Sequence, residues 1–118
     1  MAKILVVDDN SKCRKNLTTY LKLNGYEVAQ AHDGREAIRK CDNERFDLVL
    51  TDIIMPGIDG FMLTAHTIKN FPSIPVVLMT GDPPNDPQRV TAMTGARGLL
   101  TKPLILNQVL AKIKEILV

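Results

Sequence analysis

The stretch LVLTDIIMPGIDG, running from Leu48 to Gly60, decides the fold. It begins as a continuous apolar run, reaches a single carboxylate at Asp52, and breaks at Met55-Pro56-Gly57. Continuous runs of Val, Ile and Leu are typical of strands buried on both faces of a parallel sheet. The segment FDLVLT, residues 46–51, is therefore predicted to be a buried strand that ends at Asp52.

Other short apolar runs alternate with segments of helical periodicity along the whole chain. The further predicted strands are residues 3–8, 26–31, 74–80 and 98–101. This alternation predicts an α/β fold, a three-layer (βα)5 doubly wound parallel sheet. A length of 118 residues, 45% of them apolar, is ordinary for one core, so a single domain over residues 1–118 is expected.

Capping residues and apolar stripes locate the helices. Predicted N-caps are Asp33 with Glu36, Asp59, and Asp86 before Pro87, and Gly25 and Gly95 are predicted to end helices. The helix after Asp59 is expected to carry Phe61, Met62, Ala65 and Ile68 on one side, with Met62 filling the core.

The cysteines, the histidines and the basic residues near the N-terminus are expected to have no role in chemistry. Cys13 and Cys41 lack a C-x-x-C spacing and are predicted to be reduced core thiols. His32 and His66 are expected to be ordinary surface or helix residues. Lys12, Arg14 and Lys15 are expected to form a solvated basic face, with a flank of a kinase-docking surface as the alternative.

The bulk composition excludes several classes of partner. A net charge of +2 gives no clustered basicity of the kind that nucleic-acid binding needs. No apolar run approaches the roughly 20 residues of a membrane span, and the first ten residues lack a signal-peptide pattern. A cytoplasmic location without membrane contact is therefore expected.

Polar side chains follow most of the predicted strands. The first strand ends in Asp8 and Asp9, the third in Asp52, the fourth in Thr80, and the fifth is followed by Lys102. The carboxyl ends of parallel strands meet at one edge of a sheet, so these groups are expected to lie together. The second strand ends without a comparable group, which favours an outer position and the flavodoxin-like strand order 2-1-3-4-5.

Three carboxylates at one edge require a counter-charge, because two of them about 4 Å apart repel by about 4 kcal/mol at an effective dielectric constant of 20. Mg²⁺ prefers oxygen ligands and is the predicted cation, with Lys102 adding a second positive charge. Such a set is typical of phosphoryl chemistry. The chain has neither of the common glycine-rich nucleotide loops, so Asp52 is predicted to carry the phosphoryl group covalently.

The segments VVDDN, LVLTDIIMPGIDG, VVLMTGD and LLTKP together resemble the signature segments of the receiver domain of two-component response regulators, in order and across the whole chain. The resemblance implies that Asp52 accepts a phosphoryl group from a phosphohistidine on a sensor histidine kinase or phosphotransfer protein. It also implies that Asp8, Asp9, Asp52 and the backbone carbonyl of Ile54 bind Mg²⁺.

The same resemblance assigns roles on the other side of the site. Lys102 would contact the phosphoryl oxygens, the Thr80 hydroxyl would move towards them, and the peptide between Lys102 and Pro103 would be cis. The fourth helix, fifth strand and fifth helix would form the face that signals to an output protein, a fused output domain or a second copy of the chain.

Three positions, Leu99, Leu104 and Ile54, depart from the usual family pattern, and Leu104 stands where Phe often follows Lys-Pro. Leu99 replaces the aromatic residue that commonly precedes the Lys by three positions, so an aromatic switch is absent there. Ile54 stands where many members have a polar side chain near the attacking water, and its counterpart after Thr80 is Asp82. An apolar Ile54 is expected to leave the acyl phosphate long-lived. Gly81 is expected to leave the mouth of the site open.

Two other classes of function compete with a phosphoacceptor that slowly hydrolyses its own phosphate. A small Mg²⁺-dependent phosphatase with an aspartyl nucleophile would need D-x-D after the first strand, where this chain has Asp8-Asp9-Asn10. A receiver-like interaction module that is never phosphorylated is disfavoured by the complete acidic set, although Leu99 leaves it open.

Overall fold

The computed structural model describes residues 1–117 of the chain. Its centre is one parallel sheet with the strand order β2-β1-β3-β4-β5. The strands are β1 (Lys3–Val7), β2 (Glu27–Ala31), β3 (Leu48–Asp52), β4 (Val76–Thr80) and β5 (Gly98–Thr101). The predicted α/β fold and strand order are confirmed.

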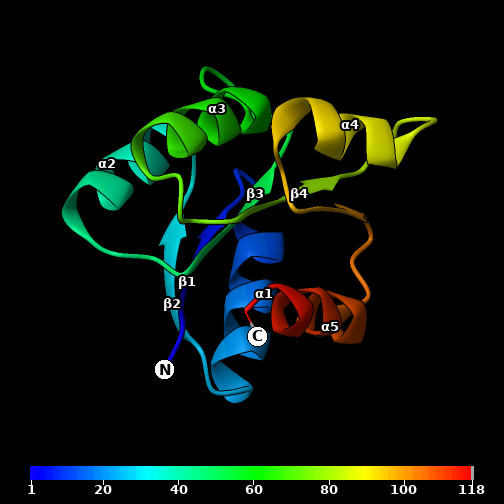
Figure 1. The fold of residues 1–118 in the computed structure, drawn as a ribbon. Helices are drawn as coiled ribbons and strands as arrows, with labels where there is room; N and C mark the ends of the chain where they lie inside the picture. The colour runs from blue at the N-terminus through cyan, green and yellow to red at the C-terminus, as the bar shows by residue number, and fades with distance from the viewer. Residues whose placement is uncertain (118) are drawn as a thin grey trace.

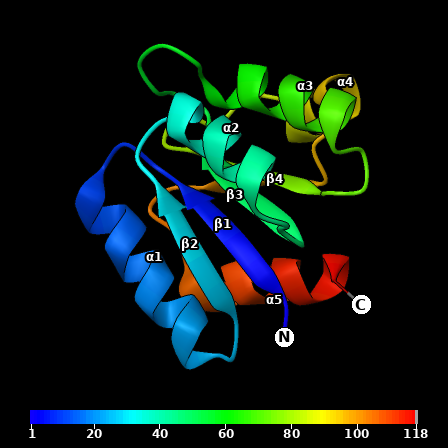
Figure 2. The same ribbon diagram turned by 90° about the vertical axis from the view of Figure 1, so that its left-hand side faces the viewer.

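Five helices alternate with the strands and cover the sheet on both faces. They are α1 (Ser11–Leu23), α2 (Gly34–Asn43), α3 (Gly60–Asn70), α4 (Pro87–Thr94) and α5 (Leu106–Ile116). Helices α2, α3 and α4 lie on one side of the sheet, and α1 and α5 lie on the other (Figures 1 and 2). No helix within residues 1–117 is long and apolar enough to cross a bilayer.

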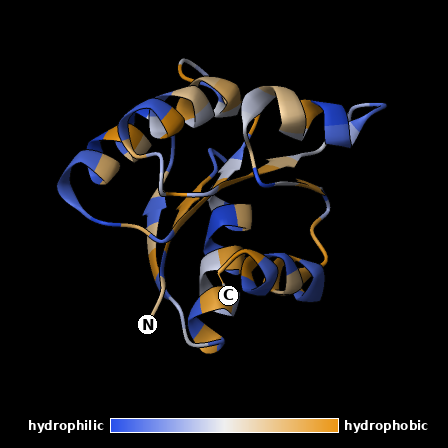
Figure 3. Cartoon of the chain, in the orientation of Figure 1, coloured by the Kyte–Doolittle hydropathy of each residue, from blue (hydrophilic) through white to orange (hydrophobic). Residues whose placement is uncertain are grey.

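The core forms two layers, because successive strand residues point to opposite faces of the sheet. Leu5, Val49 and Leu78 pack towards α2 and α3, whereas Leu50 and Met79 pack towards α1 and α5. The interior strands accordingly appear hydrophobic in Figure 3, while the helices carry both hydrophilic and hydrophobic residues. Burial on both faces explains why the sequence shows continuous apolar runs instead of alternation.

The predicted helix boundaries are confirmed by their caps. The carboxylates of Asp33, Asp59 and Asp86 accept hydrogen bonds from the backbone N–H three residues on, at 2.8, 2.8 and 3.1 Å. Gly25 and Gly95 have φ of 91° and 83°, the left-handed conformation that glycine adopts without strain. The side chain of Glu36 accepts from the N–H of His32 at 2.8 Å, one residue before the cap itself.

The expectation for α3 is wrong about which face packs. Phe61 and Met62 are 40% and 54% exposed, so Met62 does not fill the core. The buried face instead consists of Gly60, Leu63, Thr64 and Thr67. The two threonine hydroxyls donate to the carbonyls of the residues four positions earlier, at 2.7 and 2.8 Å. Because these internal hydrogen bonds satisfy the hydroxyls, threonine can be buried where an apolar residue was expected.

The prediction for the cysteines is right for Cys41 and wrong for Cys13. Cys41 is buried, whereas Cys13 is exposed. Burial in α1 begins one turn later, at Leu17, and continues through Thr18 and Leu21. Cys13 lies in the first turn of α1, outside the part of the helix that covers the sheet.

Candidate functional site

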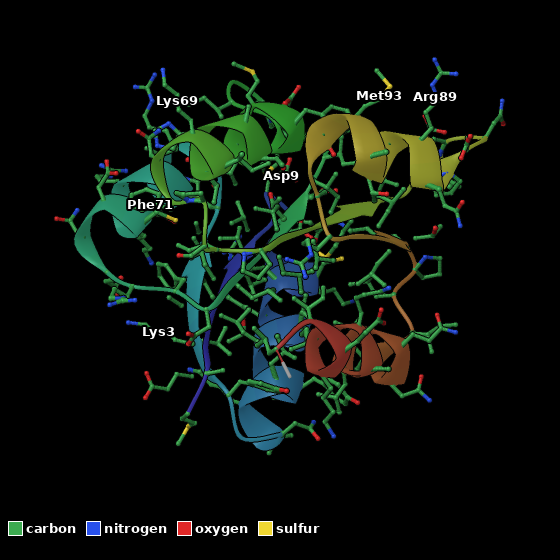
Figure 4. All side chains as sticks on the ribbon, in the orientation of Figure 1. Lys3, Asp9, Lys69, Phe71, Arg89 and Met93 are labelled. Atoms are coloured by element: carbon green, nitrogen blue, oxygen red, sulfur yellow. The ribbon has the colours of Figure 1, made fainter. Side chains whose placement is uncertain are left out.

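Three carboxylates converge at the carboxyl ends of β1 and β3. Asp8 and Asp9 follow β1, Asp52 ends β3, and the two strands are hydrogen-bonded neighbours. One carboxylate oxygen from each of the three lies within 4.8 Å of those of the others. Lys3 and Asp9, both labelled in Figure 4, lie at opposite ends of β1, so the acidic cluster occupies one edge of the sheet.

The acidic cluster is largely withdrawn from water. Asp8 is 1% exposed and Asp52 is 8% exposed, while Asp9 faces solvent. All three offer hard oxygen ligands, the donor type that Mg²⁺ prefers, and Asp9 keeps one side of the cluster accessible. The chemistry of the donor set therefore fits a magnesium ion.

Lys102 provides the cation that the structure itself places at the cluster. Its ammonium donates to Asp8 Oδ2 at 2.8 Å and to Asp52 Oδ2 at 3.2 Å. Lys102 follows β5, the strand at the far edge of the sheet, and its long side chain extends from there to the acidic cluster. One lysine faces three carboxylates, which leaves the cluster with an excess of negative charge.

Burial and charge shift two pKa values in the cluster. Burial raises the pKa of Asp52, with repulsion from Asp8 and Asp9 acting in the same direction, and these effects outweigh the opposing contact with Lys102. Burial lowers the pKa of Lys102, but its contacts with Asp8 and Asp52 outweigh burial and raise it overall. Lys102 therefore stays charged, and Asp52 holds a proton more tightly than a solvated aspartate.

The loop after β1 is held by contacts that the sequence did not reveal. The N–H of Asn10 donates to Asp8 Oδ1 at 2.9 Å. The guanidinium of Arg14 donates to the backbone carbonyl of Asp8 at 2.8 Å and to Gln30 Oε1 at 3.1 Å. Arg14 is half-buried, so the expected solvated basic face is wrong for this residue, although Lys12 and Lys15 are exposed. Nothing in the sequence around Arg14 indicates that its side chain contacts the Asp8 carbonyl and Gln30.

The backbone after Asp52 requires glycine at position 60. A Cβ on Gly60 would lie 2.3 Å from the carbonyl oxygen of Asp52 and 2.7 Å from the Cα of Ile53. The N–H of Gly60 donates to the carbonyl of Ile53 at 2.8 Å. The N-terminus of α3 thus lies directly against the end of β3, which fixes the backbone beneath the Asp52 carboxylate.

Thr80 ends β4, and the hydrogen bonds of its hydroxyl within residues 1–117 go to the backbone of Asp82 rather than to a carboxylate of the acidic cluster. The Thr80 hydroxyl accepts from the N–H of Asp82 at 3.0 Å and donates to the Asp82 carbonyl at 3.3 Å. Thr80 is buried and Asp82 is exposed. A Cβ built on Gly81 would meet no atom within 4 Å, so the space beside Thr80 is open.

The other predicted site residues lie around this centre. The side chain of Ile54 is 66% exposed beside Asp52. Leu99 is half-buried and packs against the core layer under α2, α3 and α4. The peptide bond between Lys102 and Pro103 is cis, as the resemblance implies.

Comparison with known proteins supplies independent observations. The model of the response regulator receiver domain matches residues 4–114. Protein PilH of Pseudomonas aeruginosa is 34% identical over 119 residues, which cover 99% of this chain and 98% of PilH. The transcriptional regulatory protein CpxR homolog of Haemophilus influenzae is 37% identical over 118 residues, and the match covers 99% of this chain and 51% of that protein. The chain thus spans nearly all of one such relative and about half of another.

A solved structure extends the similarity to three dimensions. The response regulator protein TrrA from Thermotoga maritima, in complex with Mg²⁺-BeF, superposes with a TM-score of 0.88 at 30% identity. The superposition covers 98% of this chain and 99% of that one.

Proposed function

This chain belongs to the response regulator receiver family, and we propose that Asp52 is the side chain that accepts its phosphoryl group. The chain serves two-component signalling as a phosphoacceptor rather than as a classical enzyme. The observation that carries the assignment is the convergence of Asp8, Asp9 and Asp52 with Lys102, which contacts the carboxylates of Asp8 and Asp52.

The transfer requires a nucleophile, a donor and charge stabilisation. A carboxylate oxygen of Asp52 forms a bond to phosphorus, and the P–N bond of a donor phosphohistidine breaks. The electron pair stays on the imidazole nitrogen, which takes up a proton. The product is an acyl phosphate on Asp52 and a neutral histidine on the donor.

We propose that Asp8, Asp9 and Asp52 hold Mg²⁺ together with the backbone carbonyl of Ile54. Their oxygen ligands support this proposal, as does the Mg²⁺-BeF complex of the related protein TrrA. The chemistry that the ion supplies when bound is neutralisation of charge on the phosphoryl oxygens.

Lys102 and Thr80 complete the proposed site. Lys102 lies 3.2 Å from Asp52 Oδ2 and stays charged, so it can pair with an added phosphoryl oxygen. Thr80 can donate to another such oxygen once its hydroxyl leaves Asp82. That movement would link the chemistry to the face formed by α4, β5 and α5, which we propose as the output surface.

Receiver domains work with histidine kinases and output domains, and one surface here suits the donor. A mostly apolar groove of about 230 Å³ is lined by residues of α1 and of the segment after β5, namely Cys13, Asn16, Leu17, Lys102, Pro103, Leu104 and Leu106. A donor helix seated there would bring its phosphohistidine to the acidic cluster. We propose a cytoplasmic sensor kinase or phosphotransfer protein as this donor.

Intact-mass spectrometry tests the central assignment. After incubation with MgCl₂ and a small acyl phosphate, the wild-type protein should gain one phosphoryl group, and Asp52→Asn should not. The assignment fails if Asp52→Asn gains the group at the wild-type rate. Asp59→Asn is a matched control, because Asp59 is an aspartate that caps α3 and should leave phosphorylation unchanged.

A further inference from the structure

Arg14 reaches the acidic edge from α1 through a pair of directed hydrogen bonds. Its Nη1 donates to the backbone carbonyl of Asp8 at 2.8 Å, and its Nε donates to Gln30 Oε1 at 3.1 Å. The guanidinium is planar and its donors have fixed directions, so two such bonds orient the groups that they join. Arg14 therefore ties the loop after β1 to the edge strand β2.

The Asp8 carbonyl is a sensitive point at which to hold this loop. It belongs to the peptide that joins Asp8 to Asp9, so its direction determines where the Asp9 side chain leaves the backbone. The Asp8 side chain is already fixed by the N–H of Asn10 at 2.9 Å and by Lys102 at 2.8 Å. Arg14 supplies the corresponding restraint on the backbone between the two carboxylates.

Gln30 holds Arg14 without neutralising it. Within residues 1–117, no carboxylate lies at ion-pair distance from Arg14, and both oxygens that its side chain contacts are neutral. The backbone carbonyl of Gln30 in turn accepts a hydrogen bond from the Lys40 ammonium of α2. Gln30 thus has its backbone tied to α2 while its side-chain oxygen accepts from Arg14.

We propose that Arg14 is a positioning residue for the phosphoryl-transfer site, which sets the geometry of the Asp8–Asp9 metal ligands and depends on Gln30 for its own orientation. This inference rests on the proposed magnesium site. Two simpler roles predict different results. A residue acting by charge alone would weaken cation binding, so its removal would tighten it. A residue acting on stability alone would leave cation affinity unchanged.

A titration with MgCl₂ at constant ionic strength separates these roles. Binding is followed by the ¹⁵N–¹H NMR shifts of the Asp9 and Asn10 amides in the whole chain, and the free energy of unfolding is measured in parallel. Arg14→Met should bind Mg²⁺ about 10-fold more weakly, the usual effect of removing a group that orients a metal ligand. Gln30→Leu retains Arg14 but removes the acceptor that orients it, so this variant should also bind Mg²⁺ more weakly than wild type, by a smaller factor than Arg14→Met.

Lys15→Met is the matched control, because Lys15 follows Arg14 in α1 and its side chain is exposed. It removes the same charge and should leave the dissociation constant unchanged or slightly lower. The inference is overturned if Arg14→Met binds Mg²⁺ as tightly as wild type or more tightly. If Arg14→Met does not fold, the test is made with Gln30→Leu. A dissociation constant for Mg²⁺ equal to that of wild type in this variant would overturn the inference.

The titration also distinguishes failure of this inference from failure of the proposed function. If wild type shows no saturable Mg²⁺ binding, or Asp9→Asn binds as wild type does, the proposed metal site is wrong. If wild type binds, Asp9→Asn loses affinity and Arg14→Met does not, only the role of Arg14 is wrong.

Discussion

Lys102 supplies the one ammonium within residues 1–117 that contacts the acidic cluster, and replacing it by methionine removes that charge while keeping much of the aliphatic length of the side chain. The ammonium lies 2.8 Å from Asp8 Oδ2 and 3.2 Å from Asp52 Oδ2. The Lys102 side chain is 19% exposed, and those of the two aspartates are 2% and 11% exposed. The variant therefore leaves two buried carboxylates next to Asp9 without their cation.

The expected loss of stability follows from these distances and from desolvation. Each contact is worth about 5 to 6 kcal/mol of Coulomb energy at an effective dielectric constant of 20, before desolvation is subtracted. Breaking a buried pair by removing one partner typically costs about 3 to 5 kcal/mol, and the partial exposure of Lys102 favours the lower end. We expect a loss of about 3 kcal/mol without Mg²⁺, which lowers Tm by about 10 °C.

Urea unfolding in EDTA, followed by circular dichroism, measures this loss and its pH dependence. The pKa of Lys102 is raised in the folded state, so its contribution is complete below 10.5 and disappears as the pH rises through the folded value. The pKa of Asp52 is raised above 3.8, so its ionisation costs stability at neutral pH, and protonation relieves that cost as the pH falls through the folded value. The difference between wild type and Lys102→Met should therefore be largest between these two limits.

Addition of MgCl₂ should restore more stability to Lys102→Met than to wild type, because the ion replaces the missing positive charge. Lys15→Met is the control for loss of one exposed charge and should change stability by less than about 0.5 kcal/mol. A loss in Lys102→Met no larger than this, at neutral pH and without Mg²⁺, would refute the view that Lys102 compensates the buried carboxylates.

Three further predictions concern the backbone, the thiols and the phosphate lifetime. Gly60→Ala should lower the free energy of unfolding by about 1 to 3 kcal/mol, because the added Cβ would meet backbone atoms of Asp52 and Ile53. Gly81→Ala should change the free energy of unfolding little, because a Cβ there would lie in open space. Equal effects of the two substitutions in urea titrations would contradict this reasoning. An alkylating agent at pH 8 should label Cys13 in the native protein and Cys41 only after unfolding. Burial raises the pKa of Cys41 from 9.0 to about 11, which lowers the reactive thiolate fraction about 100-fold. Rapid labelling of both cysteines in the native protein, measured by mass spectrometry, would contradict this prediction. Ile54→Asn should shorten the lifetime of the acyl phosphate, because a polar side chain at this position can orient the attacking water. Decay of the phosphorylated mass measures this lifetime, and an equal or longer lifetime in the variant would show that the apolar side chain of Ile54 does not prolong it.

Much of the fold follows from local sequence rules. Continuous apolar runs predicted all five strands, and their shared direction predicted that the polar groups at the carboxyl ends of β1, β3 and β5 would meet at one edge. The caps Asp33, Asp59 and Asp86 were also correctly predicted, because each interacts with a backbone N–H only three residues away. Short-range chemistry of this kind is readable without knowing the neighbours in space.

Only the tertiary structure decided which helical faces are buried and which side chains support the site. Helical periodicity groups Phe61 with Ala65 and Ile68, but it does not say whether that face or the one with Thr64 and Thr67 meets the sheet. The close approach of Gly60 to the Asp52 backbone selects the threonine face. Likewise, Arg14 finds Gln30 16 residues away, because α1 and β2 pack beside β1. The sequence determined the strands, the caps and the acidic edge, whereas the packing of helices on the sheet determined the contacts that hold that edge in place.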